Sequence, residues 1–145
     1  MTVHGPRSIL AVLAAAFLVI ACASLAVDGR NLGGTSWRAV RVVDKVPAVG
    51  SEPTLVFESG GVRGFGGCNG FTGQTPASID NGKLDLGEIL ATLGGCLDAS
   101  GADTPGMRLV PLFLRTLGSA NHVAFRGDQL VLSGPDGELV FERAP

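Results

Sequence analysis

The sequence predicts a small, mainly β domain whose antiparallel strands form a sandwich or a small closed barrel, with one helix. Three observations carry this prediction. From Trp37 onward, apolar and polar residues mostly alternate, which is the period of a half-buried strand. Glycine-rich turns separate these alternating segments, and the 145 residues include 22 glycines. One segment, at about residues 105–117, changes to a helical period, and this helix can cover an open end of the barrel.

An apolar segment precedes the predicted domain. Residues 9–23, ILAVLAAAFLVIACA, follow Arg7 and a short polar lead, which is the layout of a secretory signal peptide. Fifteen residues are short for a bilayer span, which needs about 20. Extending the apolar run to Val27 makes a span just possible. The segment therefore indicates export.

The end of this segment resembles the lipobox of bacterial lipoproteins. The residues VIAC, positions 19–22, give an aliphatic residue followed by two small or aliphatic residues and a cysteine. In that family the signal is cut before the cysteine, which is then acylated, so the resemblance implies lipidation at Cys22. Several acyl chains give stable membrane attachment. Cleavage after Ala23 or Ala26, or an uncleaved anchor, are the alternatives.

This organisation places the chain in the cell envelope. Residues 1–21 are expected to be the signal peptide, residues 22–34 a tether, and residues 35–143 the folded domain. The membrane is the expected partner of the N-terminal lipid, and the domain faces the periplasm or the exterior. The net charge of −2 becomes −3 when Arg7 is removed, with no charged runs. Nucleic acid is therefore not an expected partner, because its binding relies on basic patches.

The first half of the domain contains strands separated by glycine. Residues 36–44 alternate and predict a first strand, and residues 54–59 predict a second. Gly60–Gly61 is the expected tight turn into a third strand at 62–67. Residues 70–83 are rich in small and polar residues and predict mainly loop or an irregular edge strand. In the first strand the two expected faces are Trp37, Ala39, Arg41 and Val43 against Arg38, Val40 and Val42.

The C-terminal third predicts a three-stranded meander at residues 122–126, 129–133 and 138–143. Gly127–Asp128 suits a type II′ turn between the first two strands. The residues GPDG at 134–137 suit a type I turn between the last two. The expected core face of this meander consists of Val123, Phe125, Leu130, Leu132, Leu139 and Phe141.

The predicted helix begins at Thr104–Pro105, an N-cap followed by proline at the first helical position. Gly118 is expected to end the helix in a left-handed conformation. Pro111 conflicts with a helix that starts at Pro105, because proline inside a helix costs about 3 kcal/mol. Either the helix is kinked, or its regular part starts near Val110 with Pro111 in its first turn, and we expect the second arrangement. The apolar face consists of Val110, Phe113, Leu114 and Leu117.

The stretch GFGGCNGFTG, residues 64–73, fits neither of two glycine-rich phosphate-binding motifs. A P-loop needs G-x-x-x-x-G-K-[ST], and no lysine occurs between Lys45 and Lys83. The dinucleotide fingerprint needs a third glycine where this chain has Asn69, and a helix where it has a polar loop. The stretch instead predicts a sharp turn, in which Asn69 bonds neighbouring backbone and Phe65 and Phe71 anchor in the core. The glycines expected to allow positive φ or close approach are 64, 66, 67, 70 and 73.

The cysteines favour a disulfide. With Cys22 lipidated, Cys68 and Cys96 form an even pair in an oxidising compartment, where disulfides persist. A bridge closing this loop stabilises the fold by roughly 3.5 kcal/mol in the chain-entropy model. Two alternatives use His122: as the base for a Cys68 nucleophile, or with both cysteines as a metal ligand. Neither follows a spacing rule of such sites. No catalytic residue, metal or cofactor is therefore expected.

The central motif resembles the META domain, or HslJ-like, family. The resemblance covers about residues 34–143 and includes a glycine-rich turn, a leucine pair and a threonine before a second cysteine. The matching residues are Gly67, Cys68, Asn69, Phe71, Gly73, Leu84, Leu86, Thr92 and Cys96. The chain departs from the family at Val110, where a glutamate is usual, at Leu93–Gly94, where a methionine is frequent, and near Gln74, where tyrosine is common.

The resemblance implies a lipocalin-like antiparallel barrel with one helix and no established catalytic activity. Bacterial members are typically exported, and some are linked to heat shock and novobiocin resistance. We therefore expect a non-enzymatic, lipid-anchored protein that acts in envelope stress or antibiotic tolerance by binding an envelope protein. Two alternatives are a small-ligand-binding barrel and an inhibitor of a secreted hydrolase.

Overall fold

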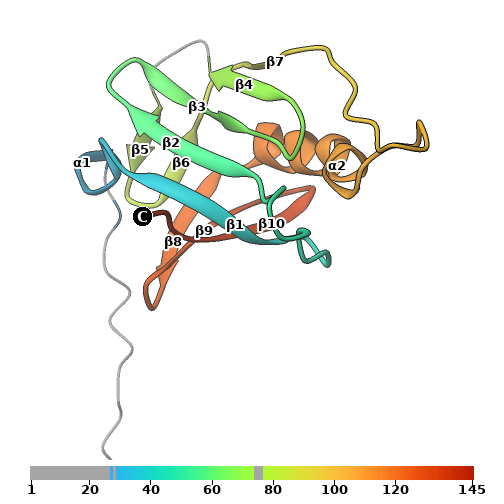
Figure 1. Ribbon diagram of the computed structural model, residues 1–145. Coiled ribbons are helices and arrows are strands. Elements are labelled where there is room, and N and C mark those ends of the chain that lie inside the picture. The colour runs from blue at the N-terminus through green and yellow to red at the C-terminus, as the bar shows by residue number, and fades with distance from the viewer. Residues whose placement is uncertain (1–26, 28, 74–76) are drawn as a thin grey trace, which may run out of the picture.

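The fold is an antiparallel sheet that curls into a half-barrel around one helix (Figure 1). It is seen in a computed structural model, which describes residues 27, 29–73 and 77–145. Two helices occur in these residues, α1 (Gly29–Leu32) and α2 (Pro105–Ser119). The strands are β1 (Ser36–Val42), β2 (Thr54–Glu58), β3 (Gly61–Phe65), β4 (Gly70–Gly73), β5 (Ser78–Asp80), β6 (Lys83–Asp85), β7 (Ile89–Ala91), β8 (His122–Arg126), β9 (Gln129–Gly134) and β10 (Gly137–Arg143).

The mainly β prediction is confirmed, and the sheet order explains the curl. The ten strands follow the order β5-β6-β8-β9-β10-β1-β2-β3-β4-β7. The first long strand, β1, therefore lies between β2 and the last strand, β10, which brings the two halves of the chain together. The edges of the sheet are β5 and β7. The strands β4 to β7 are short and lie within residues 70–91; the first part of this segment, residues 70–83, was predicted to be mainly loop or an irregular edge strand.

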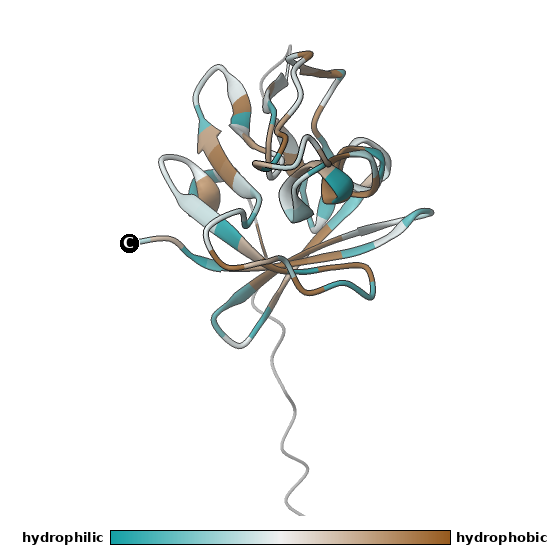
Figure 2. Cartoon of the chain, turned by 45° about the vertical axis from the view of Figure 1, so that its right-hand side comes forward, coloured by the Kyte–Doolittle hydropathy of each residue, from teal (hydrophilic) through white to brown (hydrophobic). Residues whose placement is uncertain are grey.

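The interior of the half-barrel is filled by side chains. Trp37, Phe113 and Phe141 are fully buried, and the rings of Phe113 and Phe141 lie 6.4 Å apart. Phe113 comes from α2, so the helix closes the concave side of the sheet (Figure 2). Small barrels either fill with side chains or hold a ligand, and this one is filled. The expected core residues of the C-terminal meander are buried, except for Phe125, which is half-buried and packs against the ring of Trp37.

Helix α2 runs without a break from Pro105 to Ser119, so the expected late start near Val110 is wrong. Thr104 caps it as predicted, since its Oγ1 accepts a hydrogen bond of 3.2 Å from the Met107 N–H. Pro111 is accommodated because burial of the helix offsets its cost. Phe113 and Leu117 are fully buried, and each contributes about 1.5–3 kcal/mol, against about 3 kcal/mol for the proline.

The expected end of α2 at Gly118 is also wrong. The helix continues through Ser119, and the C-cap Ala120 has extended backbone angles. The Ala120 N–H donates to the Leu117 carbonyl at 3.2 Å, which closes the last turn without a left-handed residue. A glycine at position 118 is therefore not needed by the backbone.

Strand β1 carries a β-bulge that changes which residues face the core. Ala39 pairs with Phe141 and Arg41 pairs with Val140, so Val40 is the extra residue. The buried positions are Trp37, Ala39 and then Val42. The alternation expected through Arg41 and Val43 therefore fails after Ala39, because a bulge shifts the two-residue period by one.

The hairpin turns follow the sequence closely. Arg126 pairs with Gln129 across the two-residue turn Gly127–Asp128. In this turn Gly127 has a positive φ of 64° and Asp128 does not have a positive φ, which is the pattern of a type II′ turn. Gly134 pairs with Gly137 across Pro135 and Asp136, as predicted. Between β2 and β3 the two-residue turn is Ser59–Gly60, one residue earlier than the expected Gly60–Gly61.

The folded domain starts earlier than residue 35. Val27 and Leu32 are buried in the core, and Leu32 lies in the short helix α1. The last part of the expected tether is therefore packed against the domain. The expected signal peptide and Cys22 lie outside the described residues. Among the residues that are described, no helix is long and apolar enough to cross a membrane.

Candidate functional site

The glycine-rich turn packs directly on the start of α2. Residues 66–69 connect β3 to β4, and the Gly66 N–H donates to the Asn69 carbonyl at 2.7 Å. Gly67 has φ 108°, and a Cβ built on Gly106 would lie 2.1 Å from the Gly67 carbonyl oxygen. The backbones of the turn and the helix therefore touch at two glycines, and neither position has room for a side chain.

The other glycines of this stretch divide into two groups. A Cβ on Gly64 would lie 2.0 Å from the Thr54 carbonyl oxygen, and one on Gly73 would lie 3.0 Å from the Leu86 carbonyl oxygen. Gly66 and Gly70 have neither positive φ nor a close contact. All five glycines were expected to allow positive φ or close approach of the backbone, and this expectation is wrong for Gly66 and Gly70.

The strap, which we define as residues 92–104, joins β7 to α2 across the turn. Cys68 and Cys96 are bonded, with a Cα–Cα distance of 5.8 Å, which lies in the usual range of disulfides. The Thr104 N–H donates to the Cys96 carbonyl at 2.9 Å, so the bridge also lies against the helix start. No strap residue is buried. The strap is thus held by polar contacts and the disulfide, without an apolar core of its own.

Asn69 holds the beginning of the strap. Its Nδ2 donates to the carbonyls of Thr92, at 2.6 Å, and Gly94, at 3.2 Å. The side chain is only 6% exposed, and its Oδ1 finds no hydrogen-bond partner among the described residues. We expected Asn69 to bond its neighbouring backbone and to tolerate a left-handed conformation. Instead it has no positive φ and reaches residues more than twenty positions away.

Asp98 organises the tip of the strap. Its Oδ1 accepts hydrogen bonds from the Ser100 hydroxyl, at 2.5 Å, and the Ser100 and Ala102 N–H groups. The Ser100 hydroxyl is the main cause that lowers the pKa of the Asp98 carboxyl, followed by the two backbone donors. This is the pattern of a carboxylate that caps a loop, and it gives no indication of acid–base chemistry.

The residues of the alternative chemical sites are not assembled. Cys68 is in the disulfide, so it carries no thiol in this structure. His122 is exposed on β8, where its Nδ1 lies 2.6 Å from Asn121 Oδ1. Within the described ranges, no three histidine, cysteine, aspartate or glutamate side chains gather as metal ligands would.

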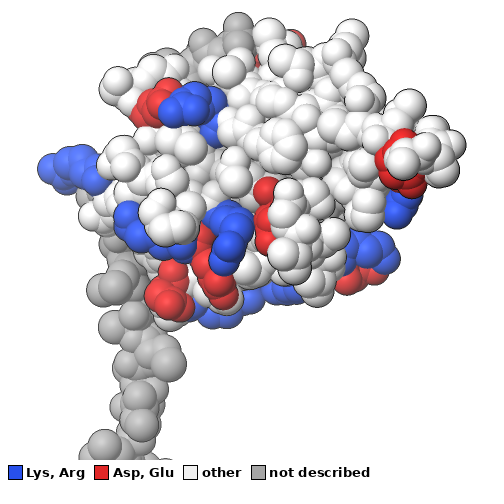
Figure 3. Space-filling view, in the orientation of Figure 1, with Lys and Arg blue, Asp and Glu red and all other residues white. Residues whose placement is uncertain are grey.

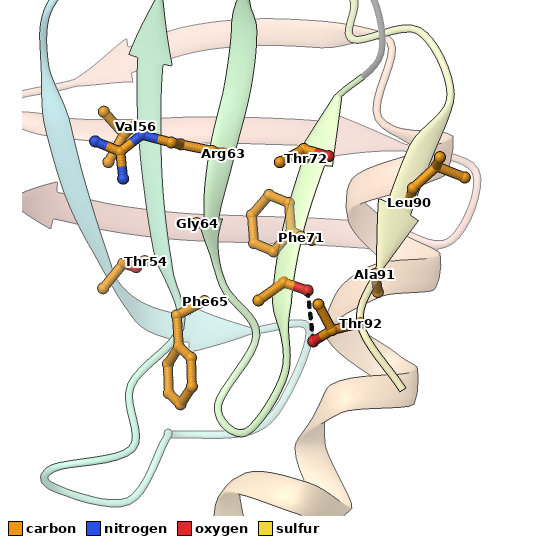
Figure 4. A pocket seen from close by; sticks show the side chains of 11 residues that line it. Thr54, Val56, Arg63, Gly64, Phe65, Phe71, Thr72, Leu90, Ala91 and Thr92 are labelled. Atoms are coloured by element: carbon orange, nitrogen blue, oxygen red, sulfur yellow. Dashed lines mark hydrogen bonds between the residues drawn. The ribbon is translucent and has the colours of Figure 1, made fainter. Parts of the chain in front are cut away.

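A groove lies on the outer face of β2, β3, β4 and β7, and we call it the outer groove (Figure 4). Its volume is about 510 Å³, within the range of small-molecule sites. In Figure 3 a broad area of uncharged atoms covers this part of the surface. The groove is lined by Thr54, Val56, Arg63, Gly64, Phe65, Gly70, Phe71, Thr72, Leu90, Ala91 and Thr92.

Strand register explains why these side chains share one face. The side chains on the outer face form two rows that run across the strands. In the first row, which begins at Thr54, Gly70 has no side chain, and this leaves a gap between its neighbours. Phe71 faces inward and is buried, but Phe65 is 38% exposed on the outer face, so its expected place in the core is wrong. The strand period could have shown this, because Phe65 shares its face with the exposed Arg63. The rows are Thr54, Phe65, Gly70 and Thr92, and then Val56, Arg63, Thr72 and Leu90.

A second group of exposed apolar side chains lies at one end of the molecule. Loop 43–53, turn 66–69, the strap and the start of α2 meet there, and we call this the loop end. Pro105 borders the same surface pocket as loop residues Val46 and Ala48. The large exposed apolar side chains on these loops are Val46, Val49, Leu93 and Leu97.

Known proteins support the same fold. The META domain family matches residues 30–145. A protein from Burkholderia xenovorans, solved by NMR, is 25% identical, with a TM-score of 0.63 over 80% of this chain and 86% of that chain. A second NMR structure is 19% identical, with the same TM-score over 80% of this chain and 94% of that chain, and it is similar in fold. No curated protein matches the chain. The resemblance seen in the sequence is therefore confirmed, and the chain belongs to the META domain family.

Proposed function

We propose that this META domain protein is an exported, lipid-anchored, non-enzymatic protein that binds an envelope partner through its loop end. The observation that carries the proposal is that the start of the described domain and the exposed apolar side chains of the loop end lie at opposite ends of the molecule. Helix α1 and the C-terminus lie on one side of Figure 1, and the strap lies on the other.

The strand register supports this separation. The Ala144 N–H donates to the Ser36 carbonyl at 2.9 Å, so the C-terminus lies beside the start of β1. Strand β1 then runs away from this end toward loop 43–53. A tether at the N-terminus therefore leaves the loop end free to contact another molecule.

Exposed apolar residues on loops favour protein recognition over a purely structural role. Val49 and Leu93 are almost completely exposed, and the disulfide and Asn69 hold the strap that carries Leu93. Loops on a rigid scaffold are frequent binding elements, and exposed apolar clusters are typical of interaction sites. The family resemblance adds an envelope-stress or antibiotic-tolerance context to the proposal.

The anchor also suits the start of the domain. The buried Val27 lies five positions after Cys22. A fully extended chain of this length spans at most about 18 Å. A lipid on Cys22 would thus hold the domain close to the membrane surface, where envelope proteins are within reach.

The anchor is tested by mass spectrometry of the protein purified from the membranes of cells that produce it. An N-terminal peptide that starts at acylated Cys22 is the expected result. A chain that retains Met1, or one cut after Ala23 or Ala26, would contradict lipidation. Cys22→Ala should abolish the acylated N-terminal peptide. Cys68→Ser is the matched control and should leave acylation intact.

The partner site is tested with photo-crosslinking amino acids in the full chain in its native membrane. Val49 and Leu93 probe the loop end, and Ser59, exposed in the β2–β3 turn at the opposite end, is the control. We expect one discrete adduct shared by Val49 and Leu93 and absent at Ser59. Equal labelling at all three positions, or labelling at Ser59 alone, would exclude the loop end as the site.

A further inference from the structure

Gly70 is a glycine that the fold does not require. Its φ is compatible with any residue, and a Cβ built on it would find nothing nearer than 3.8 Å, the Gly64 carbonyl oxygen. Gly64, on the neighbouring strand, has no such freedom. Glycine weakens a strand and often marks a bulge, a tight bend or a place where a ligand or another backbone approaches closely. Gly70 pairs with Phe65 in an unshifted register, so it does not stand at a bulge. Gly70 lies at the floor of the outer groove.

The walls around Gly70 are apolar and partly exposed. Phe65 lies on one side of it in the same cross-strand row, and Leu90, which is 47% exposed, stands on the edge strand β7. Thr92 borders the gap on its other side, where its Oγ1 donates to the Gly70 carbonyl at 3.3 Å (Figure 4). A ring placed over Gly70 would therefore contact the face or edge of the Phe65 ring, a favourable arrangement for aromatic pairs.

One positive charge borders the groove. Among the described residues that line it, Arg63 alone carries a charge. Its Nε donates to Glu58 Oε1 at 2.6 Å, and both side chains are about half exposed. A guanidinium has further donors on its two terminal amino groups, and it attracts both anions and aromatic faces. An exposed ion pair of this kind is weak, so an added anion can compete with Glu58.

From these observations we propose that the outer groove binds a flat aromatic molecule that carries one anionic group. The ring lies over Gly70 between Phe65 and Leu90, and the anion lies toward Arg63. The groove is shallow and open to solvent, which suits a flat molecule, and its volume of about 510 Å³ is sufficient for a molecule of two fused rings. This site is on the outside of the sheet, and it adjoins the loop end at Thr92, the first residue of the strap.

The test uses naphthalene-2-sulfonate as the probe and the neutral naphthalene-2-sulfonamide as its matched control. The full chain is placed in lipid nanodiscs with ¹³C-labelled methyl groups, and the shifts of Val56 and Leu90 are followed by NMR. We expect saturable shifts of both resonances, with weaker binding of the sulfonamide. Shifts that do not saturate, or that occur only at Val46 and Val49, would overturn the proposal.

Variants locate the site. Gly70→Leu fills the gap and should weaken sulfonate binding by about tenfold or more, whereas Gly118→Leu, at an exposed helix position with open space around it, should leave binding unchanged. If Gly70→Leu does not fold, Phe65→Leu keeps an apolar wall without the ring and should also weaken binding. Equal affinity in the wild type and in the folded groove variant would overturn the proposal.

The charge requirement is tested separately. Arg63→Gln should weaken binding of the sulfonate and leave that of the sulfonamide unchanged. Glu58→Gln breaks the same ion pair but keeps the Arg63 charge, so it should maintain or strengthen sulfonate binding. If Arg63→Gln and Glu58→Gln weaken binding equally, the ion pair acts only structurally and the anionic part of the proposal is wrong.

Discussion

At the scale of single residues, two glycines determine how the turn meets the helix. Gly67 and Gly106 are 39 positions apart in the chain, yet their backbones are in contact. A β-carbon on Gly106 would overlap the Gly67 carbonyl and also lie 2.9 Å from Ser51 Cβ. Because these neighbours are mostly backbone, they cannot move aside cheaply. The contact therefore holds together three segments: loop 43–53, the turn and α2.

This contact gives a prediction with a control in the same helix. Gly106→Ala should lower the free energy of unfolding by about 1–3 kcal/mol, the usual cost of overpacking. Gly118→Ala, with open space around it, should raise it by up to about 1 kcal/mol, because alanine favours the helix. Urea denaturation measures both. Equal effects of the two changes would show that helix propensity, and not the contact, dominates.

At the scale of elements, the strap depends on a single covalent bond. Its side chains are exposed or half-exposed, so burial contributes little to its position. The Cys68–Cys96 bridge, the bonds from Asn69 and the Thr104–Cys96 hydrogen bond connect it to the rest of the domain. Segments with few buried apolar contacts open locally at low cost. The bridge is therefore the main constraint on this element.

Cys68→Ser tests that role. In oxidising buffer the variant should melt roughly 10 °C or more below the wild type, since a bridge of this span contributes roughly 3.5 kcal/mol. In excess reductant the two proteins should melt together. Differential scanning calorimetry under both conditions decides the matter. An equal loss in both buffers would mean that Cys68 acts through packing.

Glu138 links β1 and β8, two strands that are not neighbours in the sheet. On β10 it accepts from Arg41 of β1, at 2.6 Å, and from Arg126 of β8, at 3.0 and 3.2 Å. The hydrogen bond from Arg126 is the largest cause that lowers the pKa of Glu138, partial burial opposes it, and Arg41 adds to it. A lowered pKa means that the ionised carboxylate stabilises the fold at neutral pH.

The sign of the pH dependence follows from that direction. The stabilisation is fully present above the unfolded-state pKa of glutamate, about 4.3, and is lost as the pH falls through the lower folded-state value. Glu138→Gln should thus cost about 0.5–1 kcal/mol at pH 7, a figure reduced by solvent screening, and almost nothing near pH 2. Thermal melts at the two pH values measure this. Glu142→Gln, whose contact with Arg38 is 4.0 Å, is the control and should change little at either pH.

At the scale of the whole molecule, the pairing of β1 with β10 joins the two ends of the chain. Trp37 of β1 is buried, pairs with Arg143 and lies 4.9 Å below the Arg143 guanidinium. We call the pairing of β1 with β10 the seam, and it joins the two halves of the sheet. Helix α2 packs against β1, β9 and β10. The core is a single cluster that includes residues from α1 to β10. The domain is therefore expected to unfold as one unit.

Trp37 is the natural reporter for this expectation, since the chain contains no other tryptophan. Unfolding followed by tryptophan fluorescence and by far-ultraviolet circular dichroism should give coincident transitions. Fluorescence reports the seam, and circular dichroism reports the whole sheet. Two separated transitions would mean that the half formed by β2, β3, β4 and β7 opens independently.

Local signals in the sequence determined much of this fold. The alternation in β8, the turn residues between β8, β9 and β10 and the Thr104 cap act over a few positions, so they could be predicted from neighbours in the chain. In β9 and β10 three consecutive residues are buried, so the burial of Val131 and Val140 did not follow from alternation. The GCN turn and its partner cysteine indicated the META family by their residue types and order. These features depend on backbone preferences that tertiary packing did not override.

Features that depend on contacts between distant segments could not be predicted from the sequence. The bulge at Val40 arises from pairing with β10, and the run of α2 through Pro111 arises from burial of the helix against the sheet. The roles of Gly106 and Gly70 are opposite, one tightly enclosed and the other open, although both are the same residue in glycine-rich surroundings. The outer groove likewise exists only because register aligns residues of four strands. The physical reason is that sequence periodicity reports which side of a strand is apolar, whereas sterics and register depend on which segments meet.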